Sequence, residues 1–146
     1  MKQFKLLFAV LIAALCLGSC KTGGSEVDLS GHIKLGVDNF KSEIDKESAP
    51  QILDYRSVDE YAKGHIPGAI SMPVATADLV ADSEYMRNIQ STFSTTKKLF
   101  IYGGNDSWGV NGNVLPGLIA DIWGKDKTIL LDGGFGAWEK AGYPVE

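Results

Sequence analysis

Short apolar runs alternate with amphipathic segments along most of the chain. Five such runs have the length and composition of strands, at residues 32–37, 51–55, 69–72, 99–102 and 128–131. Between and after them, apolar positions recur at helical spacing, which predicts helices within residues 38–46, 57–63, 76–93, 110–123 and 135–141. Strands that alternate with helices in this way indicate an α/β fold with a parallel sheet covered on both faces.

Several predicted helices carry signals at their ends. Ser57, with Glu60 three residues later, fits a capping box and predicts a helix that begins directly after Ser57. Asp38 and Asp132 are predicted to cap the first and the last helix. Pro116 lies within a helical pattern, where we expect it to bend or delay the helix because it lacks a backbone donor.

The first twenty residues form a segment of their own. Lys2 and Lys5 precede an unbroken apolar run at residues 6–17, and the small residues Gly18 and Ser19 follow, which is typical of a secretory signal. The run is too short to span a bilayer as a stable helix. Taken by itself, this segment is typical of an ordinary cleaved signal peptide or of an uncleaved anchor.

Residues 17–20, Leu-Gly-Ser-Cys, resemble the lipobox of bacterial lipoproteins, in which the cysteine takes up lipid and becomes the mature N-terminus. Their place at the end of a signal favours this interpretation. We therefore expect a signal peptide at residues 1–19, a lipidated Cys20 with a flexible tether at residues 20–28, and one domain at residues 29–146. This predicts a lipid-anchored protein of the bacterial cell envelope that faces the periplasm, and Lys21 after Cys20 favours the outer membrane by analogy.

Cysteine usage and charge restrict the chemistry of the domain. Cys16 and Cys20 are the only cysteines, so residues 29–146 hold no thiol and no thiolate metal ligand. Residues 20–146 carry 12 basic and 18 acidic residues, a formal net charge of −6. This balance argues against nucleic acid as a partner and against electrostatic adhesion to an anionic membrane. We expect neither a metal nor a cofactor.

The segment after the fourth predicted strand is the candidate binding site. A strand that leads through a glycine-rich turn into a helix presents unpaired backbone N–H groups, and sites of α/β folds lie at the carboxyl ends of such strands. The candidate residues are Gly103, Gly104, Asn105, Asp106, Ser107, Trp108 and Gly109. The segment contains no Cys, His or Lys, so the pocket is plausible but a nucleophile is missing.

Two motifs resemble the signatures of rhodanese domains. The first comprises residues 53–57 (Leu-Asp-Tyr-Arg-Ser), 60–61 (Glu-Tyr), 64–70 (Gly-His-Ile-Pro-Gly-Ala-Ile) and Pro73, and the second comprises residues 131–138 (Leu-Asp-Gly-Gly-Phe-Gly-Ala-Trp) and 141–144 (Ala-Gly-Tyr-Pro). The resemblance implies a five-stranded parallel sheet flanked by helices and, in active members, a sulfur-carrying cysteine directly after the fourth strand. Carried over by position, Gly103 stands in the place of that cysteine. The loop looks more like that of the non-catalytic first domain of tandem thiosulfate or mercaptopyruvate sulfurtransferases.

Other polar residues have two interpretations each. Asp54 and Arg56 form either a catalytic pair at a strand end or a structural ion pair or backbone anchor. The structural role is favoured because structural ion-pair networks also perturb such groups. In the family motif His65 orders a turn, and a lone histidine is weak support for metal or acid–base chemistry. Asp132 is a helix cap, and His32 is expected in an exposed region at the start of the domain.

Two classes of function follow. The first is a non-catalytic rhodanese-like domain that binds a small anion or a protein partner at residues 103–109, although the carboxylate of Asp106 counts against an anion. Trp108 either fills the former active site or forms one of its walls. The second is an enzyme: a sulfurtransferase that works with a partner's cysteine, or a hydrolase that uses Ser107, for which no adjacent base is evident. A structural half that pairs with a separate active rhodanese domain is a third option.

Overall fold

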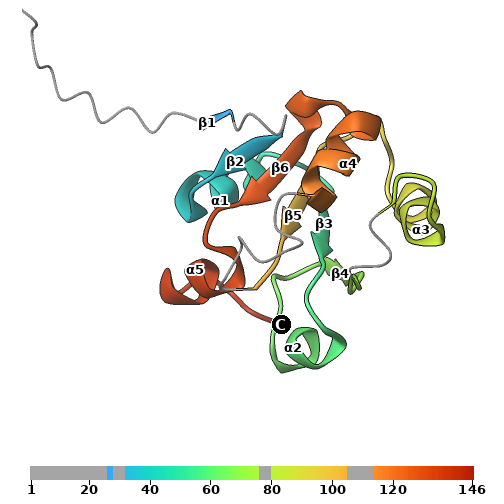
Figure 1. The fold of residues 1–146 in the computed structure, drawn as a ribbon. Helices are drawn as coiled ribbons and strands as arrows, with labels where there is room; N and C mark the ends of the chain where they lie inside the picture. Colours follow the sequence, from blue (N-terminus) through green and yellow to red (C-terminus); the bar gives the residue numbers. More distant parts are fainter. Residues whose placement is uncertain (1–25, 28–31, 76–79, 105–113) are drawn as a thin grey trace, which may run out of the picture.

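The computed structural model describes residues 26–27, 32–75, 80–104 and 114–146. Its centre is a sheet with the strand order β1-β2-β6-β5-β3-β4 (Figure 1). The strands are β1 (Glu26–Val27), β2 (Ile33–Leu35), β3 (Gln51–Asp54), β4 (Ala69–Ser71), β5 (Leu99–Tyr102) and β6 (Thr128–Leu131). The pairs β2–β6, β6–β5, β5–β3 and β3–β4 are parallel, as predicted, and β1 adds an antiparallel pair at the β2 edge.

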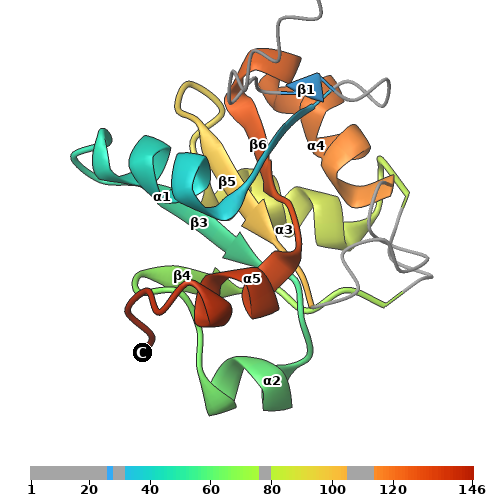
Figure 2. The ribbon, with the colours of Figure 1, turned by 90° about the vertical axis from the view of Figure 1, so that its left-hand side faces the viewer.

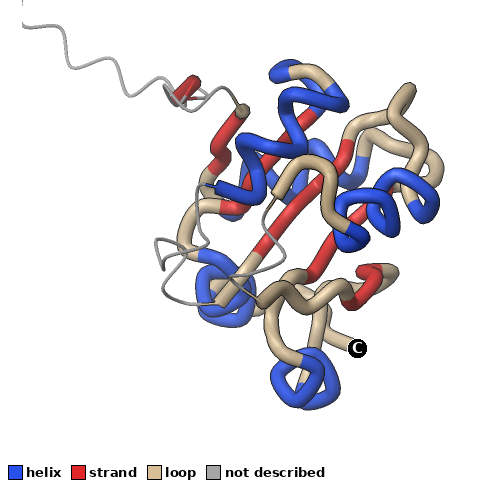
Figure 3. Tube along the Cα trace, turned by 45° about the vertical axis from the view of Figure 1, so that its right-hand side comes forward, coloured by secondary structure: helices blue, strands red, loops and turns tan. Residues whose placement is uncertain are grey.

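Helices cover both faces of this sheet, as Figure 3 shows. They are α1 (Val37–Asp45), α2 (Val58–Lys63), α3 (Glu84–Thr92), α4 (Val114–Trp123) and α5 (Gly134–Lys140), with a 3₁₀ turn at Lys125–Lys127. Buried side chains of α1 and α5 pack on one face, and those of α3 and α4 pack on the other. Helices α2 and α5 follow the carboxyl ends of β3 and β6, and both lie at that end of the sheet (Figure 2).

Alternate residues of the strands supply two separate hydrophobic clusters. The cluster under α1 and α5 takes Leu35, Ile52, Phe100, Tyr102, Ile129 and Leu131 from the sheet. The cluster under α3 and α4 takes Leu53, Leu99, Ile101 and Leu130. Burial of the central strands on both faces explains why consecutive residues in them are apolar, rather than alternating with polar ones.

Helix starts agree with the sequence prediction in one case and differ in two. Ser57 caps α2 through the predicted capping box with Glu60. Gly36, not Asp38, is the N-cap of α1, and the Asp38 carboxylate instead accepts a hydrogen bond from the Tyr143 hydroxyl at 2.7 Å. Gly133, not Asp132, is the N-cap of α5, because its φ of +76° makes the turn that a glycine favours.

Other boundaries also differ from the prediction. The third predicted helix is shorter than residues 76–93, because Ser83 caps α3 and residues 80–83 form a turn. Pro116 is the third residue of α4 as the structure describes it. The prediction started this helix at residue 110, and residues 110–113 lie outside the described part of the chain. Residues 26–27, predicted as tether, pair with β2.

The prediction for His32 was wrong, and several predicted segments lie outside the described residues. His32 is buried rather than exposed. The signal segment, Cys20 and residues 105–113 lie outside the described residues, and so do residues 76–79. Among the described residues, no helix is long and apolar enough to cross a bilayer.

Candidate binding site

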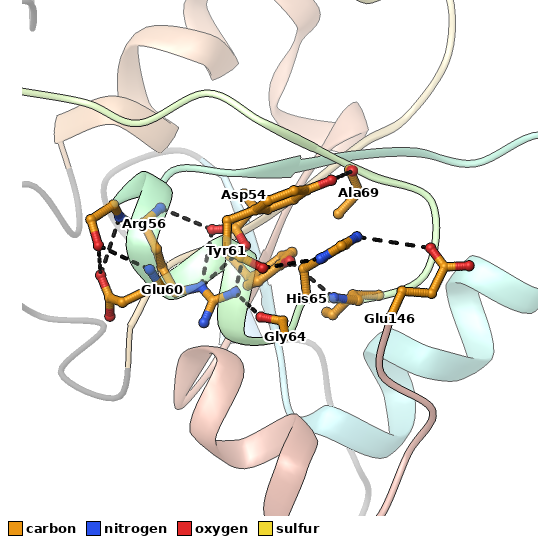
Figure 4. Close-up of polar contacts among 11 residues, drawn as sticks. Asp54, Arg56, Glu60, Tyr61, Gly64, His65, Ala69 and Glu146 are labelled. Carbon is orange, nitrogen blue, oxygen red and sulfur yellow. Dashed lines mark hydrogen bonds and ion pairs between the residues drawn. The ribbon is translucent and has the colours of Figure 1, made fainter.

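Asp54 and Arg56 form a buried ion pair where β3 ends (Figure 4). The Arg56 backbone N–H donates to Asp54 Oδ1 at 2.9 Å, and its Nη2 donates to Oδ2 at 2.7 Å. Asp54 is fully buried and the Arg56 side chain is 5% exposed. The same Nη2 also donates to the Gly64 carbonyl at 2.7 Å, so one guanidinium ties β3 to the chain directly after α2.

Aromatic rings surround this pair. The guanidinium carbon of Arg56 lies 3.9 Å from the ring centroid of Phe135 and 5.4 Å from that of Tyr102. Burial by itself lowers the pKa of Arg56, but the hydrogen bonds and charge of Asp54 outweigh it and raise the pKa above its ordinary value. Burial, reinforced by Asp54, raises the pKa of the Tyr102 hydroxyl far above its ordinary value. Both groups therefore keep one protonation state across the physiological range.

His65 is part of a turn rather than of a cluster of reactive groups. Its ring stacks on Tyr61 with centroids 3.8 Å apart, and its Nδ1 lies 3.1 Å from the Tyr61 carbonyl. Its backbone exchanges two hydrogen bonds with Glu146, and its Nε2 lies 3.8 Å from a Glu146 carboxylate oxygen (Figure 4). No group of three or more potential metal ligands occurs among the described residues.

Gly103 and Gly104 follow β5 and lie against the start of α5. The Gly103 carbonyl accepts a hydrogen bond from the Phe135 N–H at 2.9 Å. Gly134 has a φ of +57°, and a Cβ atom on it would lie 1.9 Å from the Gly104 carbonyl oxygen. The backbone directly after β5 thus approaches α5 so closely that residue 134 has no room for a side chain.

Tyr55 also lies beside the end of β5, although no sequence pattern marks it as a site residue. Its ring packs over Gly103, because a Cβ atom placed on Gly103 would lie 2.5 Å from Tyr55 Cζ. The Tyr55 N–H donates to the Tyr102 carbonyl at 3.2 Å, which fixes the backbone beside the end of β5. Tyr55 stands inside the first rhodanese-like motif, but a contact with a residue so distant in sequence has no local signal.

A pocket of about 350 Å³ opens beside Gly104. Its lining residues are Arg56, Glu60, Lys63, Gly64, Gly104, Phe135 and Glu139. The structure therefore brings together three of the predicted positions, with Arg56 and Gly104 in the wall and Asp54 bound behind Arg56. His65 and Asp132 do not line this pocket, and Asp132 instead lies 3.3 Å from the Lys34 ammonium. Of the predicted loop, residues 105–109 lie outside the described part of the chain.

Comparisons with known proteins identify the family. A family model described as "Rhodanese-like domain" matches residues 37–141, and the chain belongs to this family. The structure is similar to a crystal structure of the Alr3790 protein from Anabaena sp., with 28% identity, a TM-score of 0.58, and coverage of 76% of this chain and 79% of that one. A rhodanese-related protein from Thermoplasma volcanium has the same fold at 18% identity, with a TM-score of 0.54 and coverage of 77% and 96%.

A curated relative matches a shorter stretch. The "Putative sulfur carrier protein YrkF" of Bacillus subtilis (strain 168) is 33% identical over 45 residues. The match spans 31% of this chain and 24% of that protein, so most of the relative has no counterpart in the comparison. It agrees with the family assignment.

Proposed function

We propose that this chain is a non-catalytic rhodanese-like domain that works as a binding module. The observation that carries the proposal is that the only cysteines, Cys16 and Cys20, both precede the family match at residues 37–141. Gly103 follows β5 directly, where the family resemblance implies a sulfur-carrying cysteine. Formation of a persulfide requires a thiolate, and glycine has no side chain to supply one.

The pocket beside Gly104 is the proposed binding site, and its charges favour a protein partner over a small anion. Arg56 is neutralised by Asp54, because its Nε donates to Oδ1 and its Nη2 donates to Oδ2 of the carboxylate. Among the described residues, the other charged groups of the wall are Lys63, Glu60 and Glu139, so this part of the lining carries no net positive charge. A small dianion such as thiosulfate gains little from such a wall, whereas a protein surface with both signs of charge can complement it.

The domain is proposed to act at a membrane of the bacterial cell envelope, facing the periplasm. The support is the lipobox-like sequence at residues 17–20 after an apolar signal segment. A lipid on Cys20 and the short segment that follows would hold the binding pocket close to the membrane surface. The negative charge of residues 20–146 does not favour direct adhesion to anionic lipid.

Turnover of thiosulfate and cyanide tests the absence of catalysis. The full chain, purified in detergent, is incubated with both compounds and thiocyanate is measured, with a cysteine-containing rhodanese as the positive control. We expect no thiocyanate above the protein-free rate. Turnover that the Ser107→Ala or Cys20→Ala substitution abolishes would contradict the proposal and support the enzyme alternatives.

Binding of the anion is measured separately. Thiosulfate is titrated into the isotope-labelled full chain while amide resonances are followed by NMR. We expect the Gly104 resonance to stay in place at millimolar thiosulfate, because the wall offers no net positive charge. A saturable shift of Gly104 would favour the small-anion alternative.

A further inference from the structure

We propose that Tyr55 closes the position of residue 103, directly after β5, because its phenol ring occupies the volume that a side chain at this residue would need. The binding pocket beside Gly104 is not affected, because Tyr55 is not among its described lining residues. The ring would exclude a thiol at this position, both as a side chain of residue 103 and as the cysteine of a partner protein. The inference rests on the proposed non-catalytic function and deepens it. The inference attributes the lack of an open thiol site to Tyr55 as well as to the missing cysteine.

The distances show that the overlap is severe. A Cβ atom on Gly103 would lie 2.5 Å from both Cζ and Oη of Tyr55 and 2.6 Å from Cε2. Favourable contacts between carbon atoms occur at about 3.5–4.0 Å, so these distances are repulsive. Two of the three atoms belong to the ring itself, and removal of the hydroxyl alone would not relieve the overlap.

The ring has no easy route out of this position. Tyr55 is 9% exposed and belongs to the hydrophobic cluster under α3 and α4, together with Leu53 and Leu115. Its backbone N–H is held by the Tyr102 carbonyl. Displacement of the ring would expose apolar surface and leave a void in that cluster, and both are unfavourable.

The backbone of Gly103 is not the obstacle. The described glycines with positive φ are Gly64, Gly68, Gly124, Gly133, Gly134 and Gly142, and Gly103 is not among them. A residue with a side chain can therefore adopt the backbone conformation of residue 103. The three nearest atoms that a Cβ atom at residue 103 would meet all belong to Tyr55.

Two consequences follow for the chemistry. A single Gly103→Cys substitution does not restore an open thiol site, because the ring stands where the new side chain must go. A partner's cysteine would meet the same ring if its sulfur were to take the position of the missing thiol. The sulfurtransferase alternative that borrows a cysteine thus requires Tyr55 to move first.

A cycle of substitutions measures the overlap. Gly103→Ala is introduced into the full chain with the native Tyr55, with Tyr55→Phe and with Tyr55→Val, and the urea midpoint of each chain is compared with its Gly103 parent. We expect alanine to lower the midpoint with Tyr55 and with Tyr55→Phe, and to lower it at most slightly with Tyr55→Val. An equal fall in all three backgrounds would overturn the proposal. A fall that Tyr55→Phe also abolishes would overturn it too, since it would assign the effect to the hydroxyl.

A thiol probe gives a second readout. Gly103→Cys is placed in a chain that carries Cys16→Ser and Cys20→Ser, with or without Tyr55→Val, and the rate of reaction with Ellman's reagent is measured under native conditions. We expect the thiol to react at least tenfold faster in the Tyr55→Val chain. Equal rates in two folded chains would overturn the proposal. Thiocyanate formation by the unmodified chain would instead contradict the proposed function, so the two failures are distinguishable.

Discussion

Two glycines with a similar backbone conformation have very different surroundings. Gly134 and Gly142 have φ values of +57° and +74°. A Cβ atom on Gly134 would lie 1.9 Å from the Gly104 carbonyl oxygen, whereas one on Gly142 would meet nothing within 4 Å. Alanine at residue 142 therefore tests the cost of positive φ alone, whereas alanine at residue 134 tests positive φ together with steric overlap.

We predict that Gly134→Ala destabilises the domain far more than Gly142→Ala. The second substitution should lower the free energy of unfolding by about 1 kcal/mol, which is typical of a residue forced into positive φ. The first adds a clash with the Gly104 carbonyl group and should cost at least about 3 kcal/mol. Urea denaturation of both variants measures the difference, and similar values would contradict the close approach of Gly104 to α5.

The buried pair of Asp54 and Arg56 leads to a second prediction. Asp54→Asn leaves the Arg56 guanidinium buried without its counter-charge, and we expect a loss of about 3–5 kcal/mol in unfolding free energy. The matched control is Asp45→Asn, which breaks an exposed ion pair with Lys41 at 2.6 Å. Loss of that exposed pair should cost at most about 0.5 kcal/mol. If Asp54→Asn also costs no more than about 0.5 kcal/mol in unfolding free energy, the pair does not have the structural role that we infer.

Residue-scale predictions from sequence succeed where the contact is local. The capping box of Ser57 and Glu60 is visible because both partners lie in one turn. The expectation for His32 was wrong because its burial depends on tertiary packing, and the caps at Asp38 and Asp132 were wrong because neighbouring glycines took that position. The contact between Tyr55 and Gly103 has no sequence signal at all, since it joins the ends of two different strands.

At the scale of elements, whether a segment is a strand or a helix was easier to predict than where it begins and ends. The strands β3, β5 and β6 are recognisable because burial on both faces makes consecutive central residues apolar, while Gln51, Asp54 and Thr128 stand at strand ends. Helix boundaries were less certain, and α3 is shorter than its pattern because Ser83 starts the helix after a turn. A side chain that caps a helix decides its first residue, and several polar residues compete for that role along residues 76–93.

The caps of α2 and α3 predict different dependence on pH. Hydrogen bonds from the Ser57 hydroxyl and backbone lower the pKa of Glu60 below its ordinary value of 4.5. A carboxyl group with a lowered folded-state pKa stabilises the fold above pH 4.5, and this stability is lost as the pH falls through the lowered pKa. We expect Ser57→Ala to cost about 1 kcal/mol at pH 7 and less at pH 3.

Ser83→Ala is the matched control for this effect. Ser83 accepts a hydrogen bond from the backbone of Met86, and the residue in the position of Glu60 is therefore not ionisable. Its removal should cost about 1 kcal/mol at both pH values. Urea titrations at pH 7 and pH 3 give the four values, and an equal pH effect for both caps would show that Glu60 does not contribute through its charge.

At the scale of the whole molecule, alternation of strands and helices was sufficient to predict the parallel sheet. Two covered faces explain why both the strands and the inner sides of the helices are apolar. The sequence could not predict which face each helix covers, nor that residues 26–27 add a strand at the edge. The pocket beside Gly104 also escaped prediction, because Lys63, Phe135 and Glu139 come together only through the packing of α2 and α5.

Attachment to the membrane is the prediction that concerns the intact protein. We expect Cys20→Ala to abolish incorporation of labelled fatty acid in a bacterial host and to move most of the protein from the membrane fraction to the soluble fraction. Cys16→Ala is the control, since it changes a neighbouring cysteine within the apolar run and should leave lipid attachment intact. Continued membrane association of the Cys20→Ala protein would argue against the lipid anchor.

Each of the two hydrophobic clusters contains one tryptophan, whose fluorescence can be measured separately. Trp138 belongs to the cluster under α1 and α5, and Trp123 belongs to the one under α3 and α4. Replacement of Trp108 together with either of them leaves a single indole whose fluorescence monitors one side of the sheet. If a partner docks beside Gly104, the tryptophan whose emission changes identifies the face of the sheet that responds to binding.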